Sequence, residues 1–216
     1  MTAARKPAII MGMEHPKIII KYNRFLDPIF IGYIQAQPQW KDWTPPQKET
    51  VFQNIEMYRT EWKKYEQKII VGMYQCTGLQ FQQNIVDVHI VSGNPRPFSN
   101  PIVLKSTYSL DVFIDTLTHE LIHRLFSNND SVFPVKFLGD QFPNEEKLTK
   151  SHIFLFAVLQ YIYLEVLKDP KRLAESQQRS ATSKHHEYAR AWEIVIKEGY
   201  QKLIGSMREE IKNAHS

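Results

Sequence analysis

The sequence predicts a single α+β domain over residues 1–216, with a small mixed sheet packed on a long helix and further helices toward the C-terminus. Three observations carry this prediction. Residues 48–73 repeat apolar side chains at steps of three and four, short β-branched runs lie on both sides of that segment, and residues 153–167 form a strongly apolar helical stretch. With 216 residues, 43% of them hydrophobic, the chain can bury one substantial core.

The N-terminal half is expected to place strands around the long helix. Residues 15–25 contain a β-branched run and predict a strand, and residues 27–34 predict a second one. Prolines within residues 37–47 interrupt regular structure, after which an amphipathic helix of about seven turns begins near Lys48. Residues 84–91 alternate apolar and polar side chains, as a half-buried strand does.

The middle of the chain predicts a loop, a strand and a helix. Residues 92–101 are rich in Gly, Pro and Asn, and residues 101–106 read as a short strand. Ser109 is the expected N-cap of the next helix, because its hydroxyl can accept from an unpaired amide of the first turn. That helix is expected to end within residues 127–130.

Two further helices are expected after it. Residues 143–170 predict a helix that is capped by Asn144 and is apolar on most faces, so it should lie inside the protein. The polar residues 171–186 predict a mobile linker, and residues 186–210 predict an outer amphipathic helix.

Composition excludes several classes of protein. The most apolar stretch is interrupted by Gln160 and Glu165, which argues against a membrane-spanning helix. The apolar patch near the N-terminus is too short for the core of a secretory signal, which favours a cytoplasmic location. Cys76 is the only cysteine, so an internal disulfide and a thiolate zinc cluster are both excluded. Any metal must therefore be held by histidine and carboxylate side chains.

The charge of the chain is mildly basic. It has 27 basic and 23 acidic residues, a net charge of +4, and an isoelectric point of about 9.0. The basic residues are spread along the chain rather than bunched, which argues against nucleic acid as the partner.

The candidate functional motif is the stretch DTLTHELIHRLF, residues 115–126. On a helix of about 100° per residue, His119 and His123 lie about 40° apart on one side, so both imidazoles can point at one ion. Apolar residues gather on roughly the opposite side. The sequence therefore predicts a metal site on a helix that is backed by the core.

The residue types suit hydrolytic zinc chemistry. Neutral imidazole binds Zn²⁺ well, and two histidines leave room for one more protein ligand and a water whose pKa the ion lowers. Glu120, turned aside from the metal, would act as general base on that water and later deliver the proton to a leaving amine.

Residues 119–123 resemble the HExxH motif of the zinc metallopeptidases called zincins. The order of long helix, two strands, motif helix and second helix over residues 48–168 is similar to their N-terminal subdomain. The resemblance implies a compact zincin-like domain in which the strand 101–106 borders the cleft and pairs with an extended peptide substrate. Arg124 departs from the family, where an uncharged residue usually follows the second histidine, and the additional histidine of metzincins is missing.

The third metal ligand is expected from the helix predicted over residues 143–170. His152 is the preferred candidate, because a histidine at the edge of a deeply apolar run needs a partner. Its surroundings loosely resemble the third-ligand segment of SprT-like zincins. Glu145 is the alternative, from a loose resemblance to gluzincins, with Glu146 and Glu165 behind it. Glu145 and Glu146 could instead complement the helix dipole in a first turn.

Zincins often use a histidine or tyrosine to stabilise the oxyanion, and Tyr108, His185, His186 and Tyr188 are the candidates here. The function expected from these observations is hydrolysis of a peptide or protein substrate by a zinc metallopeptidase. Two alternatives stay open at this point: a non-catalytic module with a structural zinc or none, and a nucleic-acid-associated SprT-like protein.

Overall fold

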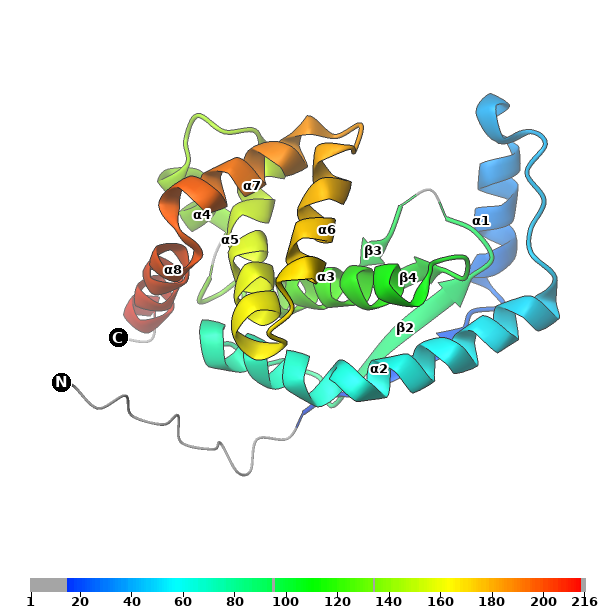
Figure 1. The fold of residues 1–216 in the computed structure, drawn as a ribbon, viewed down its shortest axis with the longest axis horizontal. Helices are drawn as coiled ribbons and strands as arrows, with labels where there is room; N and C mark the ends of the chain where they lie inside the picture. Colours follow the sequence, from blue (N-terminus) through cyan, green and yellow to red (C-terminus); the bar gives the residue numbers. More distant parts are fainter. Residues whose placement is uncertain (1–14, 95, 134, 215–216) are drawn as a thin grey trace.

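The computed structural model describes residues 15–94, 96–133 and 135–214. Over these residues the predicted α+β class is confirmed: eight α-helices accompany a four-stranded mixed sheet (Figure 1). The strands are β1 (Lys17–Tyr22), β2 (Ile85–Val91), β3 (Phe98–Ser99) and β4 (Ile102–Lys105). The helices are α1 (Leu26–Gln35), α2 (Lys48–Thr77), α3 (Leu110–Asn128), α4 (Val135–Gln141), α5 (Lys147–Tyr161), α6 (Pro170–Ala181), α7 (His186–Glu198) and α8 (Tyr200–Ala214), with a 3-10 turn at Pro38–Trp40 and a π-helical turn at Ile162–Val166.

The sheet has the strand order β1-β2-β4-β3. β1, β2 and β4 run parallel, whereas β3 is antiparallel to β4 and pairs Phe98 with Val103 and Ser99 with Ile102. The strands predicted from residues 15–25, 84–91 and 101–106 are thus confirmed. At Ile102 and Val103 the outer side of β4 is already paired, because the two residues of β3, within a predicted loop, pair with them. Only the end of β4 is left for the pairing with an extended peptide that the resemblance implies.

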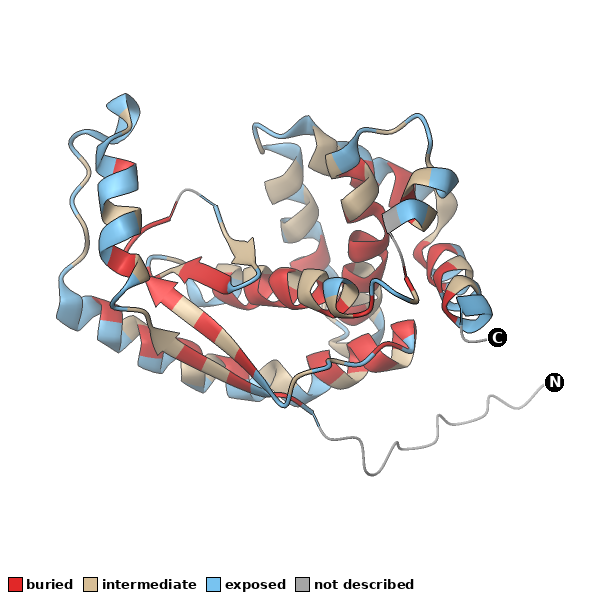
Figure 2. Ribbon diagram, turned by 180° about the vertical axis from the view of Figure 1, so that it is seen from behind, coloured by how far each residue is buried: buried red, intermediate tan, exposed pale blue. Residues whose placement is uncertain are grey.

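Helix α2 packs along the sheet and anchors α3. Its predicted apolar stripe is buried, while its other face is exposed (Figure 2). The hydroxyl of Tyr58 donates to the backbone carbonyls of Ser106 at 2.8 Å and Tyr108 at 2.7 Å, and its ring stacks on Phe113 with centroids 3.9 Å apart. These contacts fix the start of α3 against α2, upstream of the histidine motif.

The second predicted strand, residues 27–34, is wrong: this segment is helix α1. The side-chain oxygen of Asn23 accepts from the amides of Phe25 and Leu26 and so starts the helix. The buried carboxylate of Asp27 then accepts from the Tyr22 hydroxyl at 2.6 Å and from the Ser92 hydroxyl at 2.9 Å. These polar contacts hold α1 at the end of β1 and β2. They cannot be read from the alternation of apolar and polar residues that predicts strands.

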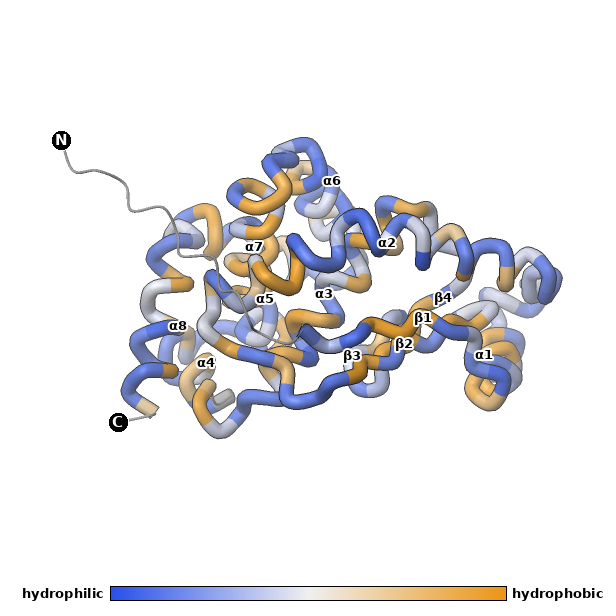
Figure 3. The backbone as a smooth tube through the Cα atoms, turned by 90° about the horizontal axis from the view of Figure 1, so that it is seen from below, coloured by the Kyte–Doolittle hydropathy of each residue, from blue (hydrophilic) through white to orange (hydrophobic). Residues whose placement is uncertain are grey.

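Helix α5 is the central helix of the C-terminal half. Every residue from His152 to Leu159 is buried, which confirms the predicted interior position, and the segment is strongly hydrophobic in Figure 3. The expected cap at Asn144 is wrong, because the helix starts at Lys147 and the amide of Glu145 donates into a turn at Phe142. Across the described residues, the helices are too short or too polar to traverse a membrane.

The segment predicted as a polar linker, residues 171–186, is mostly helix α6. The Asp169 side chain caps it by accepting from the Arg172 amide at 2.9 Å, and Pro170 occupies its first turn. The single helix expected over residues 186–210 is also wrong, because Gly199, at φ +82°, separates α7 from α8.

A buried ion cluster attaches α6 to the motif helix. The Arg172 guanidinium, which is buried, contacts Asp115 at 2.6 Å and Asp111 at 2.7 Å, and Arg179 also pairs with Asp115. The Tyr163 hydroxyl donates to the same carboxylate at 3.2 Å. Removal of one partner from such a buried pair typically costs about 3–5 kcal/mol, because the other charge is left uncompensated. α6 is therefore a fixed wall beside the motif.

Candidate metal centre

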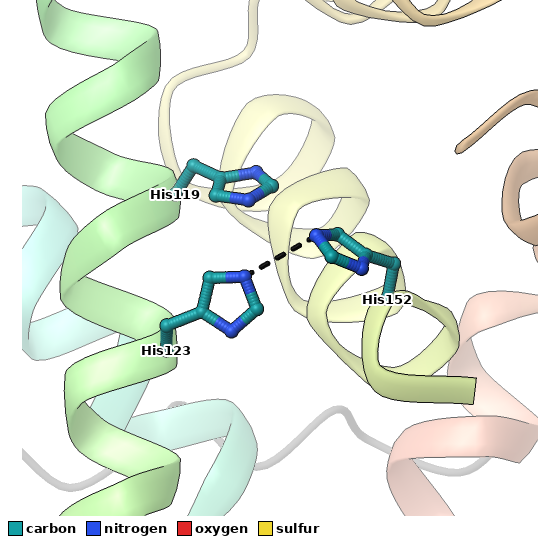
Figure 4. Close-up of side chains that lie close together, drawn as sticks. All are labelled: His119, His123 and His152. Atoms are coloured by element: carbon teal, nitrogen blue, oxygen red, sulfur yellow. Dashed lines mark hydrogen bonds between the residues drawn. The ribbon is translucent and has the colours of Figure 1, made fainter. Parts of the chain in front are cut away.

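Three histidines from two helices meet between α3 and α5. His119 and His123 lie one turn apart on α3, which begins as predicted at Ser109: the serine hydroxyl accepts from the Val112 amide. His152 projects from the first half of α5, and Figure 4 shows the three rings directed toward a common space. The structure thus brings together the two motif histidines and the preferred third candidate.

The three rings are closely spaced. Ring centroids are 4.8 Å apart for His119 and His123, 5.2 Å for His119 and His152, and 4.9 Å for His123 and His152. One nitrogen of each ring lies within 4.8 Å of the other two, and the Nε2 atoms of His123 and His152 are 3.2 Å apart. Such a cluster of ring nitrogens is compatible with a single ion between them.

The orientation of the His152 ring is set by its own helix. Its Nδ1 lies 2.8 Å from the Leu148 carbonyl, one turn earlier, and 3.0 Å from the Ser151 hydroxyl. The Ser151 hydroxyl in turn donates to the same carbonyl at 2.8 Å. Because a carbonyl can only accept, Nδ1 carries the proton and Nε2 is left with its lone pair toward His123.

These positions fit a zinc ion by the chemistry of the donor atoms. Two nitrogens that share a tetrahedral Zn²⁺ at its usual bond length are about 3.3 Å apart, and the Nε2 atoms of His123 and His152 are 3.2 Å apart. His119 supplies the third nitrogen of the cluster. Catalytic zinc sites commonly use three protein ligands and leave one position for water or substrate, whereas structural sites use four.

Electrostatics keep the three rings neutral. Burial, together with the neighbouring histidines, lowers the pKa of His119 well below its ordinary value and lowers the pKa of His123 to about 3. Burial lowers the pKa of His152 to about 4, although the bond to the Leu148 carbonyl acts in the opposite direction. Neutral imidazole is the form that binds a metal, so protons do not compete for the site near neutral pH.

Glu120 lies beside the cluster without belonging to it. Its side chain is buried, and burial raises the pKa of its carboxyl group to about 8. The carboxyl group lines the same cleft as the three histidines. A carboxyl group whose pKa lies near neutrality can both take up and release a proton, which is the requirement for a general base.

The other candidate ligands make their contacts elsewhere. Glu145 pairs with Arg190 of α7 at 2.8 Å, and Glu165 pairs with Lys168 at 3.1 Å. Glu146 lies near His186, in a second group of potential ligands that is largely exposed. Of the carboxylates considered from the sequence, none of these belongs to the histidine cluster found among residues 15–94, 96–133 and 135–214.

The three histidines and Glu120 line a cleft of about 940 Å³. Tyr108, Tyr188 and His185 of the predicted oxyanion donors line it too, whereas His186 lies beside a smaller hollow. Burial, and to a smaller extent the Glu120 carboxylate, raises the pKa of Tyr108 to about 12 and also raises that of Tyr188. Both phenols therefore remain hydrogen-bond donors at neutral pH.

Sequence reasoning missed several groups around the cleft. Asp115 and Arg179 line it, as do Arg96 and Lys184 from two connections and Lys105 from the end of β4. A spacing of four residues from Asp115 to His119 could have placed Asp115 on the same helix face. The cations carry no such signal, because each comes from a separate loop or strand end.

Comparisons of the chain with protein-family models, with curated proteins and with solved structures gave no match. The chemistry of the centre therefore follows from its own geometry.

The lowered pKa of His152 predicts a pH dependence of stability for the metal-free protein. In the unfolded chain His152 takes up a proton below about pH 6.5, whereas in the folded protein it does so only below about pH 4. The contribution of His152 to the free energy of unfolding therefore falls by about 2 kcal/mol as the pH is lowered from 7 to 5. Urea unfolding should show that the metal-free wild type loses more free energy of unfolding between pH 7 and pH 5 than His152→Ala does.

The comparison of wild type with His152→Ala isolates the contribution of His152 to the pH dependence of stability. Glu120 acts in the opposite direction, because its raised pKa makes the fold bind the extra proton, but it is present in both proteins. Replacement of the exposed His186 by alanine is the matched control, and it should leave the change of the free energy of unfolding with pH as in wild type. If the free energy of unfolding changes equally with pH in wild type and in His152→Ala, the claim that His152 is buried and neutral is contradicted.

Proposed function

We propose that this chain is a zinc metallopeptidase of the HExxH kind, with a zincin-like fold, in which His119, His123 and His152 hold Zn²⁺. The observation that carries the proposal is the meeting of three neutral imidazoles from α3 and α5 in a cleft beside a buried carboxyl group. Three protein ligands and an open cleft favour a catalytic centre over a purely structural one. The single buried Cys76 suits a reducing compartment, so the proposed location is the cytoplasm.

The metal and the protein have separate tasks in this proposal. When bound, zinc supplies Lewis-acid chemistry: it lowers the pKa of a water and polarises a carbonyl. Glu120 holds the proton that leaves the attacking water and passes it to the amine of the departing product. Because Glu120 is buried beside the cluster rather than in it, the carboxyl group is free for this transfer.

Two tyrosines that line the cleft are proposed to bind the substrate carbonyl. Tyr108 precedes α3 and Tyr188 lies on α7, so the phenols approach the cleft from separate elements. The Tyr188 ring also packs against His152, with centroids 4.7 Å apart. A phenol that donates to the developing oxyanion lowers the barrier to acyl transfer. Helix α6, held by the ion pair of Arg172 and Asp115, lines one side of the cleft.

Removal and return of the metal tests the proposal. Zinc-loaded protein is expected to cut members of a mixed peptide library, and the chelated protein is expected to lose at least about 10²-fold in rate, because only the metal makes the water acidic enough. Stoichiometric zinc should restore cleavage. Activity that survives complete chelation, or a zinc-loaded protein that cuts neither peptides nor unfolded proteins, would contradict the proposed function.

A further inference from the structure

The cleft around the histidine cluster contains more unpaired positive charge than negative charge. Arg96, Lys105 and Lys184 all line it, and over the described parts of the chain none of the three pairs with a carboxylate. The acidic residues that line the cleft are Glu120, at the centre, and Asp115, which already lies between two arginines. The unpaired charge that a ligand meets is therefore positive.

These cations occupy opposite sides of the cleft. Arg96 lies in the β2–β3 connection, with its guanidinium 5.5 Å from the centre of the Phe98 ring. Lys105 ends β4, with its ammonium 4.9 Å from the centre of the Tyr108 ring. Lys184 lies in the turn between α6 and α7, and Figure 3 shows α6 and β3 on opposite sides of α3. A chain lying in the cleft would meet a cation on either side of the centre.

We propose that the cleft selects acidic peptides, with a carboxylate side chain on each side of the peptide bond that lies at the three histidines. This inference rests on the proposed function. Positive groups at the rim of a concave site with low-dielectric walls concentrate the potential and attract an oppositely charged ligand. Cations on both rims favour a ligand with charges separated by a neutral centre, and a peptide of the form acidic–neutral–acidic has this pattern.

An acidic peptide fits this arrangement better than a nucleic acid. A phosphate backbone carries a charge at every nucleotide, whereas the unpaired cations that line the cleft, Arg96, Lys105 and Lys184, come from three separate places in the chain. A peptide needs a negative charge only where it carries a carboxylate side chain. The net charge of the whole chain is also small, at +4, and a contiguous basic track is needed for nonspecific binding to phosphates.

Binding measurements on a cleavage-deficient variant test the inference without relying on turnover. Zinc-treated Glu120→Gln is titrated with four rhodamine-labelled peptides that share a neutral central dipeptide and carry glutamates on both sides, on one side, on neither side, or lysines on both. The doubly acidic peptide is expected to bind about tenfold more tightly than the neutral one at low salt, since each exposed charge contact contributes roughly two- to fivefold. The gap should shrink toward unity near 1 M salt.

Charge reversal assigns the effect to the cleft. Arg96→Glu and Lys184→Glu change exposed side chains, so the fold should be kept, and each is expected to remove about two- to fivefold of the preference on its own side. Lys105→Glu tests the third cation. The matched control is Lys41→Glu, which changes net charge equally at an exposed residue outside the cleft and should leave the preference intact.

The outcomes separate this inference from the proposed function. Equal binding of acidic and neutral peptides, an equal loss with Lys41→Glu, or tighter binding of a single-stranded oligonucleotide that displaces the acidic peptide would overturn the inference. Cleavage of peptides without an acidic preference would overturn it and leave the peptidase standing. Selective binding of acidic peptides by a protein that cuts nothing would support the inference and contradict the peptidase.

Discussion

Replacement of Glu120 by glutamine is expected to lower peptide hydrolysis by roughly 10²- to 10⁴-fold while the protein keeps its zinc, because general acid–base catalysis has that magnitude. Glutamine preserves the size of a side chain that is only 4% exposed, so the fold should be retained. Paired measurements of kcat/KM and zinc content, made on the same preparation, check the result. Chemistry and metal binding would then be separated at one residue.

The matched control for this variant is Glu165→Gln, which removes a carboxylate outside the cleft that pairs with Lys168. It should keep both activity and zinc. A loss of less than about threefold in Glu120→Gln would exclude Glu120 as the base, since a working base contributes at least about 10². Loss of zinc together with activity would instead make Glu120 a ligand or a structural support of the centre.

Replacement of His152 by alanine is expected to weaken zinc binding by roughly 10²-fold or more. Even residues that only orient a ligand are worth about 10- to 100-fold in metal affinity, and His152 is proposed to be a ligand itself. Competition with a chromophoric chelator measures the change. Hydrolysis should fall with the zinc content, because two histidines and an unfilled position do not fix the ion.

Glu145→Ala is the control that discriminates between the two candidates for the third ligand. In the structure Glu145 pairs with Arg190 on α7, so its loss should leave zinc affinity within about threefold of wild type. The opposite pattern, with zinc lost in Glu145→Ala and kept in His152→Ala, would move the third ligand to the glutamate.

Local patterns predicted the elements around the centre well. The stripe along α2 and the cap at Ser109 depend on neighbours within one or two turns, and such signals are present in the sequence itself. The involvement of His152 was also predictable from the sequence, because a histidine at the edge of a deeply apolar run needs a partner.

The errors lie where tertiary contacts decide the structure. Residues 171–186 look like a linker, yet Arg172 buries its charge against Asp115, some 57 positions earlier in the chain, and thereby fixes α6. The prediction of a strand over residues 27–34 is wrong for a comparable reason, since α1 is held by the contact of Asp27 with Ser92. The cations at the rims of the cleft converge only after the sheet and α6 have been placed.

The most direct test of the central claim, that the three histidines hold zinc, is X-ray absorption at the zinc edge on protein purified without added metal or a histidine tag. The expected result is about one zinc per chain, with three imidazole nitrogens and one further light atom at about 2.0 Å. The zinc signal should change in His152→Ala and not in Glu145→Ala. A protein that carries no zinc and takes up none on titration, or a zinc held by fewer than two imidazoles, would contradict the claim.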